Sequence, residues 1–227
     1  MVKAVALSER IRYQESKPVV GVFCAGDPRI DEPSRQRCRN IVAMVADSIA
    51  AAVPDVATVW SPILVDGESQ ADVVAQQFRQ AGVSILVCTP DTWAFPQLSV
   101  LSLLAHFRRD TPLNITCGNS APKPGVVFAH AVNGALAQCG RLSHLNVGSW
   151  PDTGLRPAMS EGTRTALIDW VYAAATTVAL RGRRVVIFGH DSMGMETALA
   201  HILPTRSVFG IEITRLDMKL LADMLAK

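Results

Sequence analysis

The chain has 227 residues, of which 49% are hydrophobic and 19% charged, enough apolar material for one or two packed domains. A formal net charge of only +2 and an aromatic content of 6% argue against a nucleic-acid-binding surface or a base-stacking platform. Apolar runs stay shorter than the roughly 18 residues that span a bilayer, and the N-terminal residues lack a signal-peptide core. We therefore expect a cytoplasmic protein without nucleic-acid or membrane partners.

Short β-branched segments alternate with longer helical patterns from residue 19 onward. Strands are predicted at residues 19–24, 56–60, 83–88, 113–117 and 142–147. Helices are predicted at residues 35–53, 70–80, 98–109 and 125–139. This alternation is typical of βαβ crossovers, and it predicts a doubly wound α/β fold with a parallel sheet of about five strands.

A loop over residues 148–160, with two prolines and two glycines, is the best candidate for a domain boundary. We predict an N-terminal α/β domain over residues 1–155 and the beginning of a second α/β domain over residues 156–227. Its predicted elements are a helix from 161 to 180, a strand at 183–188, a helix at 196–203 closed by Pro204, a strand at 209–214 and a helix at 216–227. Parallel strands need neighbours at their edges and helices on their faces. We therefore expect the second domain to be incomplete and the chain to be the N-terminal part of a larger functional unit.

The cysteines and histidines show none of the spacings that build a metal site. The five cysteines contain no CxxC pair, and three of them lie in or beside apolar strand segments, so we expect buried, reduced thiols. The five histidines lack H-x-x-x-H and H-E-x-x-H spacing, so we predict no metal ligand among them. These residues are Cys24, Cys38, Cys88, Cys117, Cys139, His106, His130, His144, His190 and His201.

Loops that follow the strands are the candidate site, because ligands of doubly wound sheets bind beyond the carboxyl ends of the strands. After the first strand, Arg29 has the planar donor fork that clamps a hydroxyl or carboxylate, but with Asp27 it can also simply stiffen a turn. After the third strand, Trp93 suits the apolar face of a sugar ring or covers a helix end. Asp91 beside it is an acid/base group or a helix cap.

The segment GHDSMGM at residues 189–195 follows the predicted sixth strand and invites comparison with the G-x-S-x-G elbow of serine hydrolases. His190 stands where the elbow needs glycine, and the only later histidine, His201, lies within the immediately following predicted helix. A hydrolase built on Ser192 is therefore disfavoured. Neither G-x-G-x-x-G nor a P-loop motif occurs, so dinucleotide binding is not predicted. The chemical role of His190 and Ser192 stays open.

Several segments together resemble the N-terminal part of the L-fucose isomerase family, which includes L-fucose/D-arabinose isomerases. They are VGVFCAGDPRIDEPS, ILVCTPDTWAFPQ, NGALAQCG, and GRRVVIFGHDSMGMETALAH followed by FGIEITRLD. Their order and spacing cover almost the whole chain. The last pair is the most specific: a strand, a Ser-Met-Gly turn, a helix, and a strand leading to an aspartate.

This resemblance implies an aldose–ketose isomerase that uses a divalent metal, usually Mn²⁺, and acts on L-fucose, D-arabinose or a related sugar. It places the metal ligands outside this chain, in a C-terminal segment or partner chain, and assigns no catalytic residue to the chain itself. It implies a homo-oligomer whose first domain walls the sugar pocket of a neighbouring subunit. On that basis Arg29 and Trp93 are predicted to bind substrate, with Asp27 and Asp91 as companions. The alternatives are a non-catalytic sugar-binding or assembly domain and, less favoured, a serine hydrolase on Ser192.

Overall fold

The computed structural model describes residues 17–118, 125–151, 154–189, 195, 199 and 201–226. It divides the chain into two compact units, one up to Val171 and one from Tyr172, so that the division falls inside helix α6 (Glu161–Leu180). The sequence prediction placed the division between residues 155 and 156, in the loop that precedes this helix.

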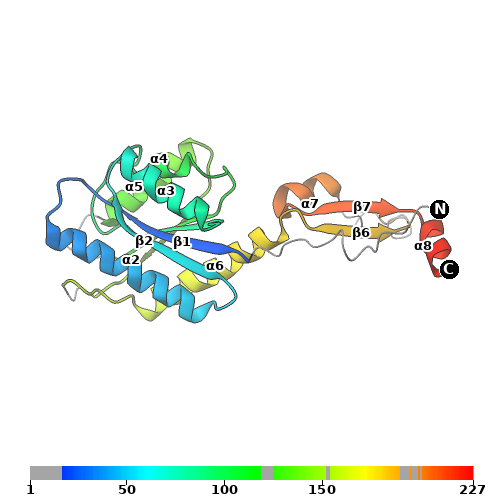
Figure 1. Ribbon diagram of the computed structural model, residues 1–227, viewed down its shortest axis with the longest axis horizontal. Helices are drawn as coiled ribbons and strands as arrows, with labels where there is room; N and C mark the ends of the chain where they lie inside the picture. The colour runs from blue at the N-terminus through cyan, green and yellow to red at the C-terminus, as the bar shows by residue number, and fades with distance from the viewer. Residues whose placement is uncertain are drawn as a thin grey trace. The chain divides into compact units, whose positions relative to one another are not determined.

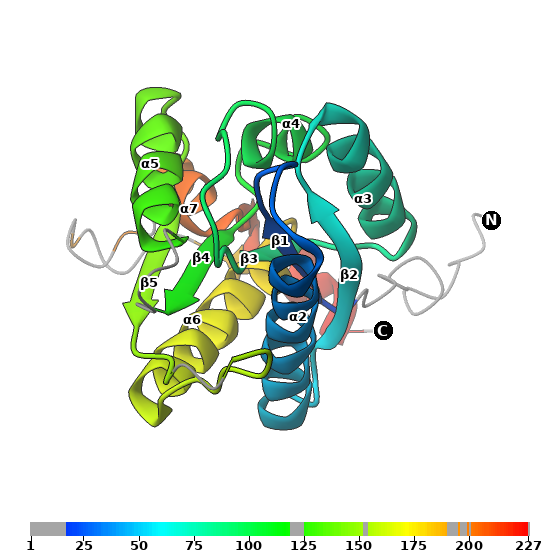
Figure 2. The same cartoon turned by 90° about the vertical axis from the view of Figure 1, so that its left-hand side faces the viewer.

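The first unit is built on a five-stranded parallel sheet with the strand order β2-β1-β3-β4-β5. Figure 1 shows β1 and β2 side by side, and Figure 2 labels all five strands. The strands are β1 (Val19–Ala25), β2 (Ala57–Val65), β3 (Ile85–Cys88), β4 (Leu113–Gly118) and β5 (His144–Gly148). Each lies within a few residues of its predicted position. The prediction of an α/β fold with about five parallel strands is confirmed.

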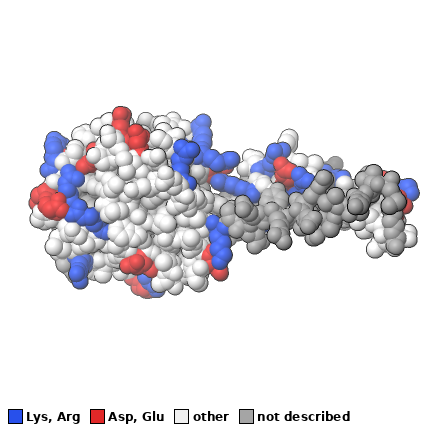
Figure 3. Space-filling model, in the orientation of Figure 1, with Lys and Arg blue, Asp and Glu red and all other residues white. Residues whose placement is uncertain are grey.

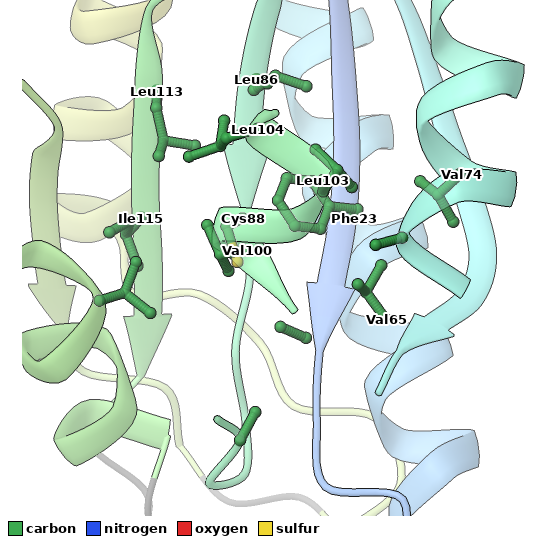
Figure 4. Close-up of a cluster of buried hydrophobic side chains, with 14 of the residues drawn as sticks. Phe23, Val65, Val74, Leu86, Cys88, Val100, Leu103, Leu104, Leu113 and Ile115 are labelled. Carbon is green, nitrogen blue, oxygen red and sulfur yellow. The ribbon is translucent and has the colours of Figure 1, made fainter. Parts of the chain in front are cut away.

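Helices cover both faces of this sheet (Figure 2). One face carries α3 (Glu68–Gln80), α4 (Val100–Leu104) and α5 (Gly125–Gln138); the other carries α2 (Glu32–Ala52) and the first turns of α6. Figure 4 shows how side chains from alternate strand positions fill the first interface. Phe23, Leu86 and Ile115 of the sheet form one hydrophobic cluster with Val74 of α3 and Leu103 of α4, and all five are fully buried. Every second residue of a strand contributes to this interface, because successive side chains of a strand point to opposite faces of the sheet.

The α6 side of β4 and β5 carries a buried chain of polar side chains instead of an apolar surface. Thr116 donates its hydroxyl hydrogen to Asn114 Oδ1, and Asn146 Nδ2 donates to Thr116 Oγ1 at 3.4 Å and to the backbone carbonyl of Thr163 at 3.2 Å. At the other end, Asn114 Nδ2 lies 3.0 Å from Nδ1 of His144. Because these groups satisfy one another, the network fixes the start of α6 on the sheet without leaving polar atoms unpaired.

Strand β2 continues to Val65, beyond its predicted end at residue 60. Its pairing with β1 becomes irregular between Val22 and Cys24, opposite the stretch that contains Pro62. Proline is tolerated here because β2 lies at one margin of the described sheet, where a missing N–H and a bulge interrupt no second ladder.

The second unit contains the parallel pair β6 (Arg184–Phe188) and β7 (Glu212–Leu216), with α7 (Ile202–Phe209) and α8 (Met218–Leu225). The predicted helix 196–203 with Pro204 at its end is wrong in its second part, because α7 begins at Ile202 and holds Pro204 in its first turn. Proline is accepted there since the first N–H groups of a helix have no partner within the helix. Residues 196–198 and 200 lie outside the described residues.

Charged side chains of the first unit lie mainly around the margin of the face shown in Figure 3, with few near its centre. Lysine and arginine are interspersed with aspartate and glutamate there, so this face carries no broad field of one sign. Among the helices of the described residues, none is long and apolar enough to cross a membrane.

Candidate functional site at the carboxyl edge of the sheet

The strand order places a topological switch point between β1 and β3. From β1 the chain continues to β2 on one side, whereas β3, β4 and β5 follow on the other side. The loops after β1 and β3 begin side by side, because the backbone N–H of Thr89 donates to the carbonyl of Phe23 at 2.8 Å. Ligands of doubly wound sheets bind at such a point, so these two loops form the candidate site.

Asp27 and Arg29 form a tight pair in the loop after β1. Asp27 Oδ1 accepts hydrogen bonds from the backbone N–H and from Nε of Arg29, both at 2.8 Å, and Oδ2 accepts from Nη2 at 2.7 Å. The hydrogen bonds from the guanidinium lower the pKa of Asp27 to about 2. The Arg29 side chain nevertheless remains 77% exposed, and within the described residues its Nη1 donates no hydrogen bond. The pair therefore both stiffens the turn and presents a pre-oriented cation to solvent.

The start of α2 is fixed directly after this pair. Asp31 is the N-cap residue, and its carboxylate accepts a hydrogen bond from the backbone N–H of Ser34 at 2.9 Å. Pro33 occupies the first turn, where its missing N–H costs nothing. Arg35 in the next turn reaches back to the carbonyl of Pro28 at 2.6 Å, so the sequence DPRIDEPS folds as one unit with the helix.

Asp91, in the loop after β3, is held by a residue that the sequence analysis missed. Arg37 of α2 donates from Nε to Oδ2 at 2.8 Å and from Nη2 to Oδ1 at 3.3 Å. Both side chains are only 4% exposed. The carboxylate of Asp91 thus faces the buried guanidinium. A signal for Arg37 existed in the sequence, because it shares the helical stripe of Cys38, Ile41 and Val45, which is otherwise apolar.

Trp93 lies half-buried at the same edge, between two phenylalanines. Its ring meets Phe95 at a centroid distance of 6.2 Å and an angle of 83°, and Phe128 of α5 at 6.1 Å and 78°. These are edge-to-face contacts, which favour a fixed ring orientation. Trp93 therefore covers the start of α5 and keeps part of its surface open, so both interpretations of this residue agree with its position.

Four of the five cysteines lie close to this region, and all five are free thiols. Cys24, Cys38, Cys88 and Cys117 are buried, whereas Cys139 is exposed. Burial raises the pKa of Cys117 to about 12 and raises that of Cys88 further. The pKa of Cys24 is raised by a hydrogen bond with Cys38 and by burial. The raised pKa values favour the protonated thiol form of Cys24, Cys88 and Cys117.

The acidic residues of this edge do not fit a divalent metal centre. Asp27 and Asp91 are each neutralised by an arginine, and a carboxylate in a bidentate pair would have to exchange that partner for the metal. Elsewhere in the described part of the chain, no three His, Cys, Asp or Glu side chains gather into a group that could hold a metal ion.

An open cavity of about 630 Å³ lies elsewhere, on the outer surface of α3. Its lining includes Asp72 and His106, which are joined by a 2.7 Å contact between Oδ1 and Nε2. The remaining lining residues are Gln76, Arg79 and Gln80. None comes from a loop at the carboxyl edge, so this cavity is separate from the candidate site. His190 and Ser192, the other residues of interest, lie outside the described residues.

Comparison with known proteins agrees with the resemblance found in the sequence. A family model described as the first N-terminal domain of L-fucose isomerase matches residues 17–182, which is most of the chain. The match includes every residue of the candidate site and both loops at the switch point. A search among curated proteins found no match to this chain. Because the family model matches well over half of the chain, the chain belongs to the L-fucose isomerase family.

Proposed function

We propose that this chain is the N-terminal region of a metal-dependent aldose–ketose isomerase that acts on L-fucose, D-arabinose or a related sugar. The observation that carries the proposal is the match of residues 17–182 to the first N-terminal domain of L-fucose isomerase. A first domain implies further domains in the family. Below, the term complete enzyme means this chain together with the polypeptide that supplies the further domains.

Within the complete enzyme, the carboxyl edge of the sheet supplies scaffold and one wall of the sugar pocket of a neighbouring subunit in a homo-oligomer. Arg29 is exposed and oriented by Asp27, which suits donation to sugar hydroxyl oxygens. Trp93 provides an apolar surface of fixed orientation for the C–H face of the ring. In this proposal Asp27 and Asp91 are positioning residues, because their carboxylates already bind arginines.

The ligands of the metal of the proposed reaction, Mn²⁺, are assigned to residues outside this chain. Such an ion would supply Lewis-acid polarisation of the sugar carbonyl, which would favour proton transfer between neighbouring carbons. Since Asp27 and Asp91 are engaged by arginines, we assign no proton transfer to this chain. Its own residues bind and orient the sugar.

A second candidate is a non-catalytic sugar-binding or assembly domain. The engagement of both acidic residues at the site by arginines favours it for the chain in isolation. The two candidates differ in one measurement, which is ketose formation from L-fucose and from D-arabinose with Mn²⁺. We expect turnover by the complete enzyme and none by the 227-residue chain. Turnover by the chain alone would eliminate the second candidate, and no turnover by the complete enzyme would contradict the first.

Trp93 gives a sharper test of the proposed pocket. We expect Trp93→Ala in the complete enzyme to weaken sugar binding more than it lowers stability, since the ring is only half-buried and packs against the margin of the core at the site. Trp60→Ala is the matched control, because Trp60 is also partly exposed but lies in the middle of β2. Sugar affinity from calorimetry and the midpoint of urea unfolding separate the two effects. Equal sugar affinity in the Trp93 variant and the wild type would count against a pocket role.

A further inference from the structure

Arg37 of α2 joins two loops that are far apart in the sequence. Its Nε and Nη2 bind the carboxylate of Asp91 in the loop after β3, and its Nη1 donates to the backbone carbonyl of Gly154 in the loop after β5. Asn40, one turn further along α2, donates to the carbonyl of Leu155 at 2.7 Å. Two residues of α2, the buried Arg37 and the partly exposed Asn40, thus bind the loops after β3 and β5 at the carboxyl edge.

The loop after β3 is also confined from the opposite face of the sheet. Gly125, the first residue of α5, packs directly against the backbone of this loop. A Cβ atom added at Gly125 would lie 2.7 Å from the carbonyl oxygen of Pro90 and 2.8 Å from Cα of Asp91. Residues 90 and 91 are therefore held between α5 on one side and Arg37 on the other, and Trp93 follows two residues later.

We propose that Arg37 is a positioning residue of the sugar pocket: through its buried ion pair with Asp91 it holds the loop that carries Trp93 in its binding orientation, and through Gly154 it couples that loop to the loop after β5. Arg37 does not itself touch the sugar. A buried arginine needs hydrogen-bond partners for its fork of donors, and here those partners come from two different loops. This inference rests on the proposed function, because the pocket is the sugar pocket assigned above.

The variant that tests the proposal removes both buried charges together. Loss of Arg37 alone would leave Asp91 as an uncompensated buried charge and could unfold the protein. In Arg37→Met/Asp91→Leu both side chains become apolar, which keeps the interior neutral and removes the clamp. Arg39→Met is the matched control on the same helix, because Arg39 pairs with Glu32 at the surface. Arg37→Lys keeps the charge but loses the bidentate fork.

Hydrogen exchange followed by mass spectrometry measures the protection of the loop amides in the absence of sugar. Backbone N–H groups of Leu98 and Ser99 bind the carbonyl of Phe95, and that of Ser160 binds the carbonyl of Ser149. In the double variant of the 227-residue chain, we expect exchange at these amides to become at least about tenfold faster while β1 and β3 stay protected. Arg39→Met should match the wild type, and Arg37→Lys should lie between the two.

Steady-state kinetics of the complete enzyme then test whether the sugar pocket is affected. For the double variant we expect KM for L-fucose to rise about tenfold with kcat changed by less than about threefold, because a displaced wall weakens binding and leaves the reacting atoms in place. Unchanged loop exchange, or faster exchange with an unchanged KM, would overturn the proposal. A wild-type enzyme that isomerises no sugar would instead refute the proposed function, while the exchange data would still decide whether Arg37 holds the loops.

Discussion

Two glycines of helix α5 should respond in opposite directions to the same substitution. Gly125 touches the backbone of the loop after β3: an added Cβ would lie 2.7 Å from the Pro90 oxygen and 2.8 Å from the carbonyl carbon of Asp91. Backbone atoms at that distance must move. At Gly134, in the same helix, a Cβ would meet nothing within 4 Å. The pair therefore separates the effect of packing from that of helix propensity.

The magnitudes follow from these distances. Gly134→Ala should stabilise the first unit by about 0.5–1 kcal/mol, because alanine loses less backbone entropy than glycine when a helix forms. Gly125→Ala should destabilise it by about 1–2 kcal/mol, since overpacking costs roughly 1–3 kcal/mol and the gain in propensity is small at a first helical position. For a unit of this size, about 1 kcal/mol shifts the melting temperature by roughly 2–4 °C.

Tryptophan fluorescence is the appropriate assay. All four tryptophans, at positions 60, 93, 150 and 170, precede Val171 and so report on the first unit. We expect the fluorescence melting temperature to rise by about 1–4 °C in Gly134→Ala and to fall by about 2–8 °C in Gly125→Ala. A rise in both variants would refute the close contact between α5 and the loop after β3, and with it the confinement of Asp91.

Three further predictions concern the polar residues and the metal. Thr116→Val should destabilise the first unit by about 1–3 kcal/mol in urea unfolding, because the buried Oδ1 of Asn114 loses its donor. Thr58→Val is its control and should be neutral or stabilising, since within the described residues the buried hydroxyl oxygen of Thr58 has no hydrogen-bond partner. The wild type should be more stable than Asp27→Asn, with the full difference present above about pH 4, and the difference should disappear as the pH falls through about 2. The reason is that Arg29 lowers the folded-state pKa of Asp27 to about 2. A difference in urea midpoint between the two proteins that stays constant over this pH range would contradict the prediction. Calorimetric titration of the 227-residue chain with Mn²⁺ should show no tight site, and tight stoichiometric binding would show that ligands were overlooked.

Much of the fold could be predicted because the strands are short and rich in apolar residues. Buried segments such as Ile85–Cys88 and residues 113–117 leave little choice of structure once their helical neighbours are recognised. The errors occur where tertiary context decides. Strand β2 passes through Pro62 because it lies at a margin of the described sheet, and α7 accepts Pro204 because its first turn needs no N–H at that position.

The loops that form the candidate site could be predicted from the sequence, but the ion-pair partner of Asp91 could not. Topology alone brings the loops after β1 and β3 together, and the Asp27–Arg29 pair is local in sequence. The partner of Asp91 lies 54 residues away, so neither spacing nor turn chemistry could identify it. Only the arginine in the apolar stripe of α2 indicated that a buried anion must face it. Whether Arg29 and Trp93 contact a sugar stays a prediction.

The unequal exposure of the thiols has a practical consequence. Cys139 follows the last turn of α5, at the end of the sheet opposite to the candidate site, and it is the exposed cysteine among four buried ones. A maleimide dye should therefore couple to this single position in the native protein without mutagenesis of the others. Such a fluorophore would sit away from the loops of the candidate site. It would therefore allow a test, at nanomolar concentration, of whether copies of the chain associate.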